Sequence, residues 1–242
     1  MDIATFPIDI QLLVQTLLYF ASVLAGFSTA VLCGVTQNRF QGNCFLYVSG
    51  DWKNMTYIDL QFGNSGACNF VIYGTVFCCI VYPLAMGCYY IYGVYTSRND
   101  RTIASQMWVM PFILANTGVA FVVFIISCIL GVGLTQTCAT LTAPRPTMYP
   151  GEYYQQFSKC QDAQWYDWQS EYRGLAFNFG AFHTHYAVAQ SASWINLLFW
   201  IIQIVLGGIR FYRNRKARAA ESYVGDIATP DDKPIGNVDP TA

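Results

Sequence analysis

Two histidines, His183 and His185, have the residue type and spacing that could bind a metal ion. On a strand, side chains two positions apart point to the same face, so both imidazoles could reach one ion. The chain has 2 His in all, and no further ligand converges on the pair. We therefore interpret both as polar residues in front of the last apolar segment, with pH sensing as the alternative, because imidazole titrates near neutral pH.

The rest of the sequence has no pattern typical of an enzyme. It contains no Gly-rich phosphate loop, no Ser nucleophile elbow and no zinc-ligand spacing. A nucleic-acid surface would need a basic excess, whereas the formal net charge is −1. We predict a protein that is not an enzyme, uses no cofactor or metal and does not bind nucleic acid.

The 9 Cys fall into two groups. Five lie in or beside long apolar segments, where a thiol packs as a small hydrophobe: Cys33, Cys78, Cys79, Cys88 and Cys128. Four lie in the polar loops, where an even number of Cys indicates disulfides if the loops face an oxidising compartment: Cys44, Cys68, Cys138 and Cys160. Pairing within each loop, Cys44–Cys68 and Cys138–Cys160, is preferred, and pairing across the loops is the alternative.

Four apolar segments account for most of the 54% hydrophobic content, and the chain is only 11% charged. They lie at about residues 8–33, 70–95, 107–134 and 189–212, and each is long enough to cross a bilayer, which takes about 20 residues. The leader MDIATFPIDI lacks Lys and Arg, so the first segment is expected to remain rather than be cleaved as a signal peptide. The predicted fold is an all-α membrane protein, a bundle of four transmembrane helices with membrane lipids around it.

Basic residues beside the segments predict the orientation. Arg98 and Arg101 lie in the short loop between the second and third segments, and a cluster follows from the end of the fourth: Arg210, Arg213, Arg215, Lys216 and Arg218. Basic clusters next to membrane spans face the cytosol. We therefore expect both termini in the cytosol of a multi-pass protein, with outer loops at about residues 34–69 and 135–188. The membrane is expected to be the plasma membrane or a secretory or endosomal membrane.

The outer loops are predicted to form a small, disulfide-bonded extracellular region. Alternating apolar and polar residues in the first loop (CFLYVSGDW, then MTYIDLQF) indicate a short β-sheet, and Asn54 begins a glycosylation sequon. The second loop is aromatic, and its Trp165 and Trp168 favour an interfacial belt or packing within the loop. A contact with a partner protein is the alternative.

Apart from Arg210 at the inner end of the fourth segment, amides are the most polar groups inside the apolar segments: Asn116, Gln190, Asn196 and Gln203. Asn196 and Gln203 are seven positions apart and share one helical face. Hydrogen bonds between helices of the bundle are the favoured interpretation, and a contact with another membrane protein is the alternative. A pore or ion-coupled transporter would be expected to carry ionisable groups there. The transmembrane domain is predicted to span residues 1–218, and the polar, Pro-containing residues 219–242 are predicted to form a disordered cytosolic tail.

Several stretches resemble the transmembrane protein 179 family of four-span membrane proteins. They are GNCFLYVSGDW at 42–52, ACNF at 67–70, GVGLTQTCATLT at 131–142, FHTHYAVAQSASWINLLFW at 182–200 and the basic exit RFYRNRK. The four loop cysteines match family positions, whereas the Tyr- and Trp-rich part of the second loop and the tail do not obviously match. The resemblance implies a four-helix bundle with a capped extracellular face, and it implies no catalytic residue or ligand.

Two functions fit these features. The first is a non-enzymatic accessory subunit of a larger membrane complex, such as an ion channel or receptor, whose partner is another integral membrane protein. Asn196, Gln203, Trp165 and Trp168 are the residues proposed to contact that partner. The second is a tetraspan of vesicles or endosomes that acts in trafficking. A pore or transporter by itself is the least favoured function.

Overall fold

The computed structural model describes residues 8–53, 57–97, 110–146, 153–154, 157–164, 167–170, 176–178 and 180–227. Four helical segments in this part of the chain are long and apolar enough to cross a membrane, as the sequence predicts. They are α1 (Ile8–Arg39), a composite second span, α5 (Met110–Leu141) and α6 (Phe182–Ile227). Each continues beyond at least one end of its apolar segment, so the helices reach into the expected loops.

The second span consists of α2 (Ser65–Thr75), a π-helical turn η2 (Val76–Val81) and α3 (Tyr82–Ser97). The π turn comes directly before Pro83, which has no N–H to donate and whose ring would clash with the carbonyl of Cys79 in a regular α-helix. Within the turn the hydrogen bonds close one residue later, as in the bond from the Tyr82 N–H to the Phe77 carbonyl. The irregularity therefore has a local sequence cause.

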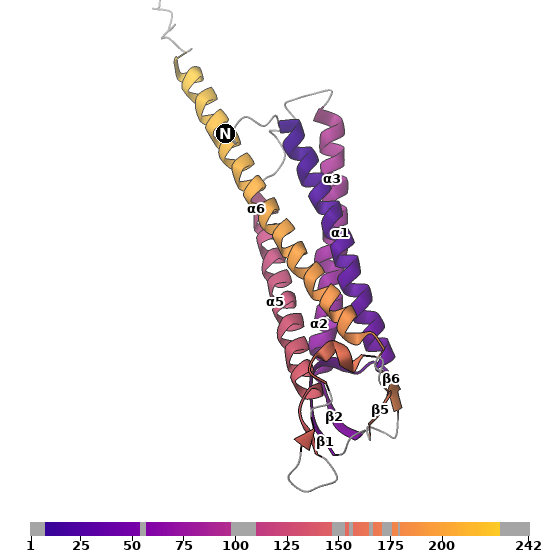
Figure 1. Cartoon of the computed structure of the whole chain (residues 1–242). Helices are drawn as coiled ribbons and strands as arrows, with labels where there is room; N and C mark the ends of the chain where they lie inside the picture. Colours follow the sequence, from indigo (N-terminus) through magenta and orange to yellow (C-terminus); the bar gives the residue numbers. More distant parts are fainter. Residues whose placement is uncertain are drawn as a thin grey trace, which may run out of the picture.

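The helices form one bundle in which α1 lies between α6 and the second span (Figure 1). α5 packs against α6 and α2. One end of the bundle carries the strands and is called the sheet end below. The other, where α1 begins and the cationic side chains Arg213, Arg215 and Lys216 follow Arg210 on α6, is called the basic end.

Strands from both loops form a four-stranded sheet at the sheet end. The order is β1 (Cys44–Trp52), β2 (Tyr57–Gly63), β5 (Asp167–Ser170) and β6 (Ala176–Asn178). β1 and β2 pair antiparallel, as the alternation in the first loop predicts, while β5 joins β2 in parallel. Two shorter elements complete this end: the pair β3 (Arg145–Pro146) and β4 (Tyr153–Tyr154), and the 3₁₀ turn η3 (Cys160–Ala163).

The boundary expected at residue 218 does not coincide with the end of a helix. α6 continues to Ile227, into the segment predicted to be disordered. The added turns begin with Ala219, Ala220 and Glu221, which have high helix propensity and prolong the helix that the preceding basic residues continue. Residues 228–242 lie outside the described part of the chain.

Candidate functional site

A line of polar contacts joins α1 to α6 along the interior of the bundle. The Nε2 atom of Gln203 donates to the Gln15 carbonyl at 2.7 Å, and the Ser22 hydroxyl donates to Asn196 Oδ1 at 2.6 Å. Nearer the sheet end, the Thr29 hydroxyl lies 3.3 Å from the Ala189 carbonyl. We call this line the polar seam.

The polar seam follows a heptad repeat on both helices. Its positions on α1 are Gln15, Ser22, Thr29 and Thr36, and on α6 they are Ala189, Asn196 and Gln203. Residues seven apart return to nearly the same side of a helix, so two antiparallel helices that cross at a shallow angle meet there repeatedly. At the sheet end the series finishes with Thr36 Oγ1 at 3.4 Å from His185 Nδ1.

The amides predicted to touch a partner lie inside this seam instead. Asn196 is 1% exposed and Gln203 is 2% exposed, and both bond to α1. The expectation that these two residues contact another protein is therefore wrong. The interpretation that the sequence favours, hydrogen bonds between helices of the same bundle, agrees with these contacts. An amide that faced hydrocarbon would lose its partners, and burial against α1 avoids that cost.

A second polar group, centred on Asn116 of α5, ties three helical segments together. The Asn116 Nδ2 donates to the Tyr19 hydroxyl at 2.9 Å, and its Oδ1 accepts from the Tyr82 hydroxyl at 2.8 Å. The Trp200 ring packs against both phenols, with centroids 5.9 Å from Tyr19 and 5.8 Å from Tyr82. The centre of the bundle is thus filled by bonded aromatic and amide side chains.

Arg210 extends the seam to the basic end. It is 4% exposed and lies close to the phenols of Tyr89 and Tyr90 on α3. From the sequence, Arg210 was grouped with the basic residues that follow the fourth apolar segment, and its burial was not predicted. A usable signal existed, because Arg210 is seven positions after Gln203 and therefore on the helical face that carries both amides.

The sheet is fixed to α5 by hydroxyl groups on the last turns of that helix. The Thr137 hydroxyl donates to the Phe45 carbonyl at 3.1 Å, and the Thr140 hydroxyl donates to the Val48 carbonyl at 2.9 Å. Between these contacts Tyr47 adopts a φ of 60°, which is unusual for a bulky residue. Its ring and Leu46 press on α5 at Gly133, where an added Cβ would lie 3.0 Å from Leu46 Cβ.

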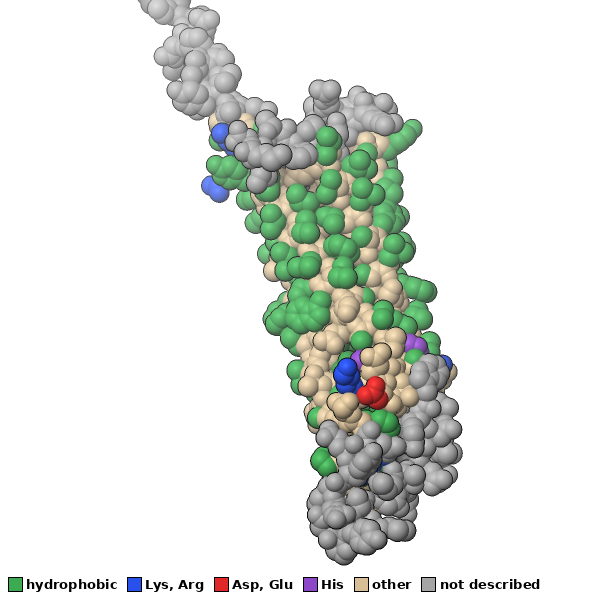
Figure 2. Space-filling model, in the orientation of Figure 1, with side chains coloured by type: hydrophobic (Ala, Val, Ile, Leu, Met, Phe, Trp, Pro, Cys, Tyr) green, Lys and Arg blue, Asp and Glu red, His purple; other side chains and the backbone are tan. Residues whose placement is uncertain are grey.

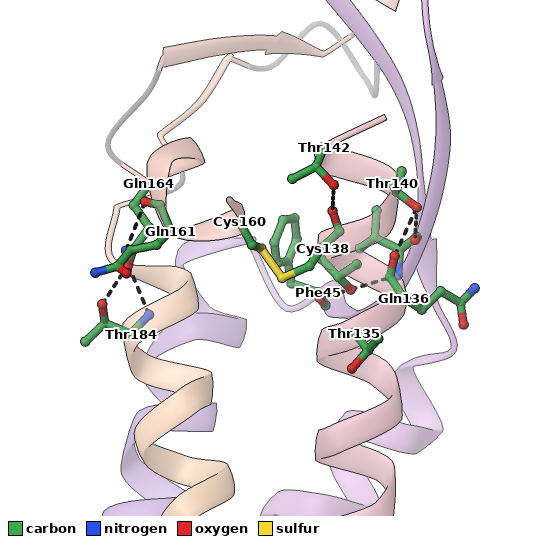
Figure 3. Close-up of a disulfide and its surroundings, with 12 residues drawn as sticks. Phe45, Thr135, Gln136, Cys138, Thr140, Thr142, Cys160, Gln161, Gln164 and Thr184 are labelled. Carbon is green, nitrogen blue, oxygen red and sulfur yellow. Dashed lines mark hydrogen bonds between the residues drawn. A yellow bond between two sulfur atoms is a disulfide. The ribbon is translucent and has the colours of Figure 1, made fainter. Parts of the chain in front are cut away.

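Disulfides add covalent links at the same end. Cys44 pairs with Cys68, which joins the start of β1 to α2, and Cys138 pairs with Cys160, which joins α5 to η3. This is the pairing within each loop that the sequence favours. The Cys138–Cys160 bond and its neighbours are drawn in Figure 3.

A buried arginine, Arg145, packs against aromatic rings and holds the start of the loop that follows α5. Its guanidinium carbon lies 3.6 Å from the centroid of the Trp52 ring and 4.9 Å from that of Phe157, and the residue is 1% exposed. A desolvated cation over an aromatic face is held by the quadrupole of the ring. No local sequence pattern distinguishes Arg145 from the other basic residues of the loops.

The two histidines do not form the pair that could bind a metal ion on a strand. Both are on the first turns of α6, where residues two apart point in different directions. His185 faces Thr36, whereas a ring nitrogen of His183 lies within 4.8 Å of the sulfurs of Cys138 and Cys160. Because those sulfurs are bonded to each other, neither offers the thiolate that a metal ion needs.

The remaining predicted site residues fall where side chains are not described. Asn54 and Trp165 lie outside the described residues. The backbone of Trp168 is part of β5, but its side chain is outside the description. The glycan and the aromatic partner contact therefore stay predictions.

This architecture, with four spans and a disulfide-bonded sheet, matches a known family along nearly its whole length. The family model described as "Transmembrane protein 179/179B Claudin domain" matches residues 11–231, which include every described helix and strand except the first three residues of α1. The chain belongs to the transmembrane protein 179/179B family.

Relatives in this family support the assignment at moderate identity. The chain is 28% identical to transmembrane protein 179B of Danio rerio over 208 residues, which cover 86% of this chain and 87% of that protein. It is 25% identical to transmembrane protein 179B of Homo sapiens over 192 residues, or 76% and 78% of the two chains. No solved structure matches the chain. The family is one of claudin-like membrane proteins and is not a known enzyme family.

Proposed function

We propose that this protein is a non-enzymatic accessory subunit of a larger membrane complex, such as an ion channel or a receptor. One observation carries the proposal: the buried amides Asn116, Asn196 and Gln203 form hydrogen bonds within the bundle. Among the described residues they do not line an open path for ions. A specific role then depends on surfaces rather than on an internal site.

The surface of the bundle supports the same proposal. Figure 2 shows hydrophobic side chains over its middle, with charged side chains at the two ends of the face drawn. Such a surface suits a membrane and offers few polar groups for recognition. The sheet end, held by two disulfides and by hydroxyl bonds from α5, is the rigid part that can present a shaped surface to a partner.

The proposal includes an orientation with both termini in the cytosol. Arg213, Arg215 and Lys216 follow α6 at the basic end, and basic residues beside a span are retained on the cytosolic side. The disulfides lie at the opposite end, which suits an oxidising compartment. The sheet would then face the outside of the cell or the lumen of a secretory or endosomal organelle.

The test is purification of the full chain from its native tissue in mild detergent, with identification of the proteins that accompany it. The informative variant is Trp165→Ala with Trp168→Ala, in the aromatic part of the second loop. The matched control is Trp194→Ala, which removes an exposed indole on the membrane face of α6. The proposal expects a stoichiometric channel or receptor partner that the double variant loses and the control retains.

Two outcomes would contradict the proposal. If the accompanying proteins are vesicle coat and sorting components, the trafficking alternative replaces it. If the purified chain alone conducts ions in liposomes, and Asn116→Leu changes that conductance, the protein is itself a pore.

A further inference from the structure

A groove lies where α6 enters the membrane at the sheet end. It is lined by Gln161 of η3 and by a group of residues on α6: His183, Thr184, Ala187, Val188 and Ser191. Its volume is about 390 Å³. Neither the polar seam nor the proposed partner contact uses these side chains.

The turn η3 is held in place as a roof over this groove. Cys160 at its start is bonded to Cys138 of α5, and Gln164 just after it accepts from the Thr184 N–H at 3.0 Å and the Thr184 hydroxyl at 2.8 Å. Figure 3 shows Gln161 and Gln164 above Thr184, beside the disulfide. The roof therefore rests on α5 and α6 together and keeps Gln161 over the membrane face of α6.

The polarity of the groove changes along α6. Near the roof it offers the Gln161 amide and the His183 imidazole, and further from the roof it offers Ala187 and Val188. The same face of α6 continues with exposed Ile195, Leu198 and Ile202. Along this side of α6, side chains that can donate hydrogen bonds are therefore followed within a few turns by apolar side chains.

The position of the groove along α6 matches the expected boundary of the membrane. At about 1.5 Å per residue, the helix from Thr184 to Arg210 is about 39 Å long. This length is close to the 40–45 Å of a bilayer with its headgroups, about 30 Å of which is hydrocarbon. The roof then lies at the level of the lipid headgroups and the apolar face at the level of the acyl chains.

We propose that this groove binds one glycerophospholipid of the leaflet at the sheet end. Its phosphate and ester oxygens accept hydrogen bonds from Gln161 and His183, and one acyl chain lies along Val188, Ser191 and Ile195. Lys159 directly before η3 and Asp162 within it are exposed and carry opposite charges, which suits a zwitterionic headgroup better than an anionic one. A partner helix fits less well, because it would continue past the headgroup level and collide with η3. A lipid molecule ends at that level with its headgroup.

The experiment uses the full chain in phosphatidylcholine nanodiscs that contain a small fraction of phosphatidylcholine with a photoreactive acyl chain. Crosslinked peptides are then identified by mass spectrometry. We expect crosslinks concentrated at residues 187–195 over those on the membrane face of α1, with about tenfold less labelling in Ser191→Trp, which fills the groove. The matched control is Thr117→Trp on α5, since Ser191 and Thr117 are both exposed hydroxyls bonded to the carbonyl four residues before.

A second variant, Gln161→Ala with His183→Ala, keeps Ala187, Val188 and Ser191 in the groove. It tests the headgroup contact if Ser191→Trp does not fold. It should lower labelling by the photoreactive phosphatidylcholine but not by a photoreactive fatty acid. Equal labelling of all membrane faces, or equal loss in Ser191→Trp and Thr117→Trp, would overturn the proposal. Displacement of the lipid from the groove by a co-purified membrane protein would assign the groove to a partner helix instead.

Discussion

The hydroxyl of Ser22 on α1 donates a 2.6 Å hydrogen bond to Asn196 on α6, and both side chains are buried in the bundle. The contact repeats seven residues away on both helices as the bond from Gln203 to the Gln15 carbonyl. Because hydrocarbon offers no alternative partners, such pairs fix which faces of two apolar helices meet. Leu, Ile and Val could pack at many rotations, whereas the polar seam permits one register.

The first prediction concerns the energy of this pair. A double-mutant cycle with Ser22→Ala and Asn196→Leu should give a coupling energy of about 0.6 kcal/mol and no more than about 1.7 kcal/mol, the range for hydrogen bonds between membrane helices. Unfolding of the purified protein in mixed micelles measures it. Additive effects of the two changes would show that the bond does not contribute to stability.

The second prediction concerns Gly26 of α1, at its contact with the π turn. An added Cβ there would lie 2.5 Å from Cys79 Cβ and 2.8 Å from the Cys79 carbonyl oxygen, so backbone must move. Gly26→Ala should destabilise the protein by about 1–3 kcal/mol. Gly34→Ala is the control on the same helix, where a Cβ meets nothing within 4 Å and should be neutral or slightly stabilising. Similar effects at the two positions in a thermal unfolding assay would contradict the close contact.

Comparison of sequence and structure shows which features have local causes. The four spans, β1, β2 and the disulfide pairing could be predicted, because hydropathy, alternation and the placement of Cys can each be read from one short segment of the sequence. The positions of β5 and β6 could not, since these strands have 4 and 3 residues, and their place in the sheet depends on β5 pairing with the distant β2 and on β6 pairing with β5. Short strands of this kind carry too little periodicity to be recognised.

Within the site, burial was the property that sequence analysis predicted least well. Asn196 and Gln203 were correctly placed on one face, but that face could have met either α1 or a partner, and only packing decides between them. Arg145 shows the opposite case. Its guanidinium stacks on Trp52, which is about 90 positions away in the sequence, and no sequence motif predicts such a contact.

The third prediction tests that contact. Arg145→Lys keeps the charge but loses the planar group that stacks on Trp52, and it should cost about 1–2 kcal/mol of stability at the sheet end. Arg39→Lys, at an exposed position at the end of α1, is the control and should change little. Limited proteolysis of the folded protein, read at sites in the sheet, measures the difference. Equal protection in both variants would mean that stacking on Trp52 adds nothing to stability.

The fourth prediction concerns the disulfides. The bond between Cys44 and Cys68 closes a loop with a sequence separation of 24, and such a link stabilises a fold by about 2–4 kcal/mol. Cys44→Ser and Cys68→Ser should reduce cell-surface expression equally, and the double variant should be no worse than either. The same relation should hold for Cys138 and Cys160, whose separation is 22. Losses that add up in a double variant would argue against the pairing in question.

The fifth prediction concerns the side of the membrane on which the sheet lies. In the sequence, the sequon Asn54-Met55-Thr56 lies between β1 and β2, so we expect Asn54 to be glycosylated if the sheet is lumenal. Digestion with an N-glycosidase should shift the mass of the wild type and of Thr56→Ser, which keeps the sequon, but not that of Thr56→Ala or Asn54→Gln. In the same cells, tags at the N- and C-termini should bind antibody only after permeabilisation, because we expect the basic end to be retained in the cytosol. A C-terminal tag accessible on intact cells, together with an unmodified Asn54, would mean that Arg213, Arg215 and Lys216 do not decide the orientation and that the bundle is inverted.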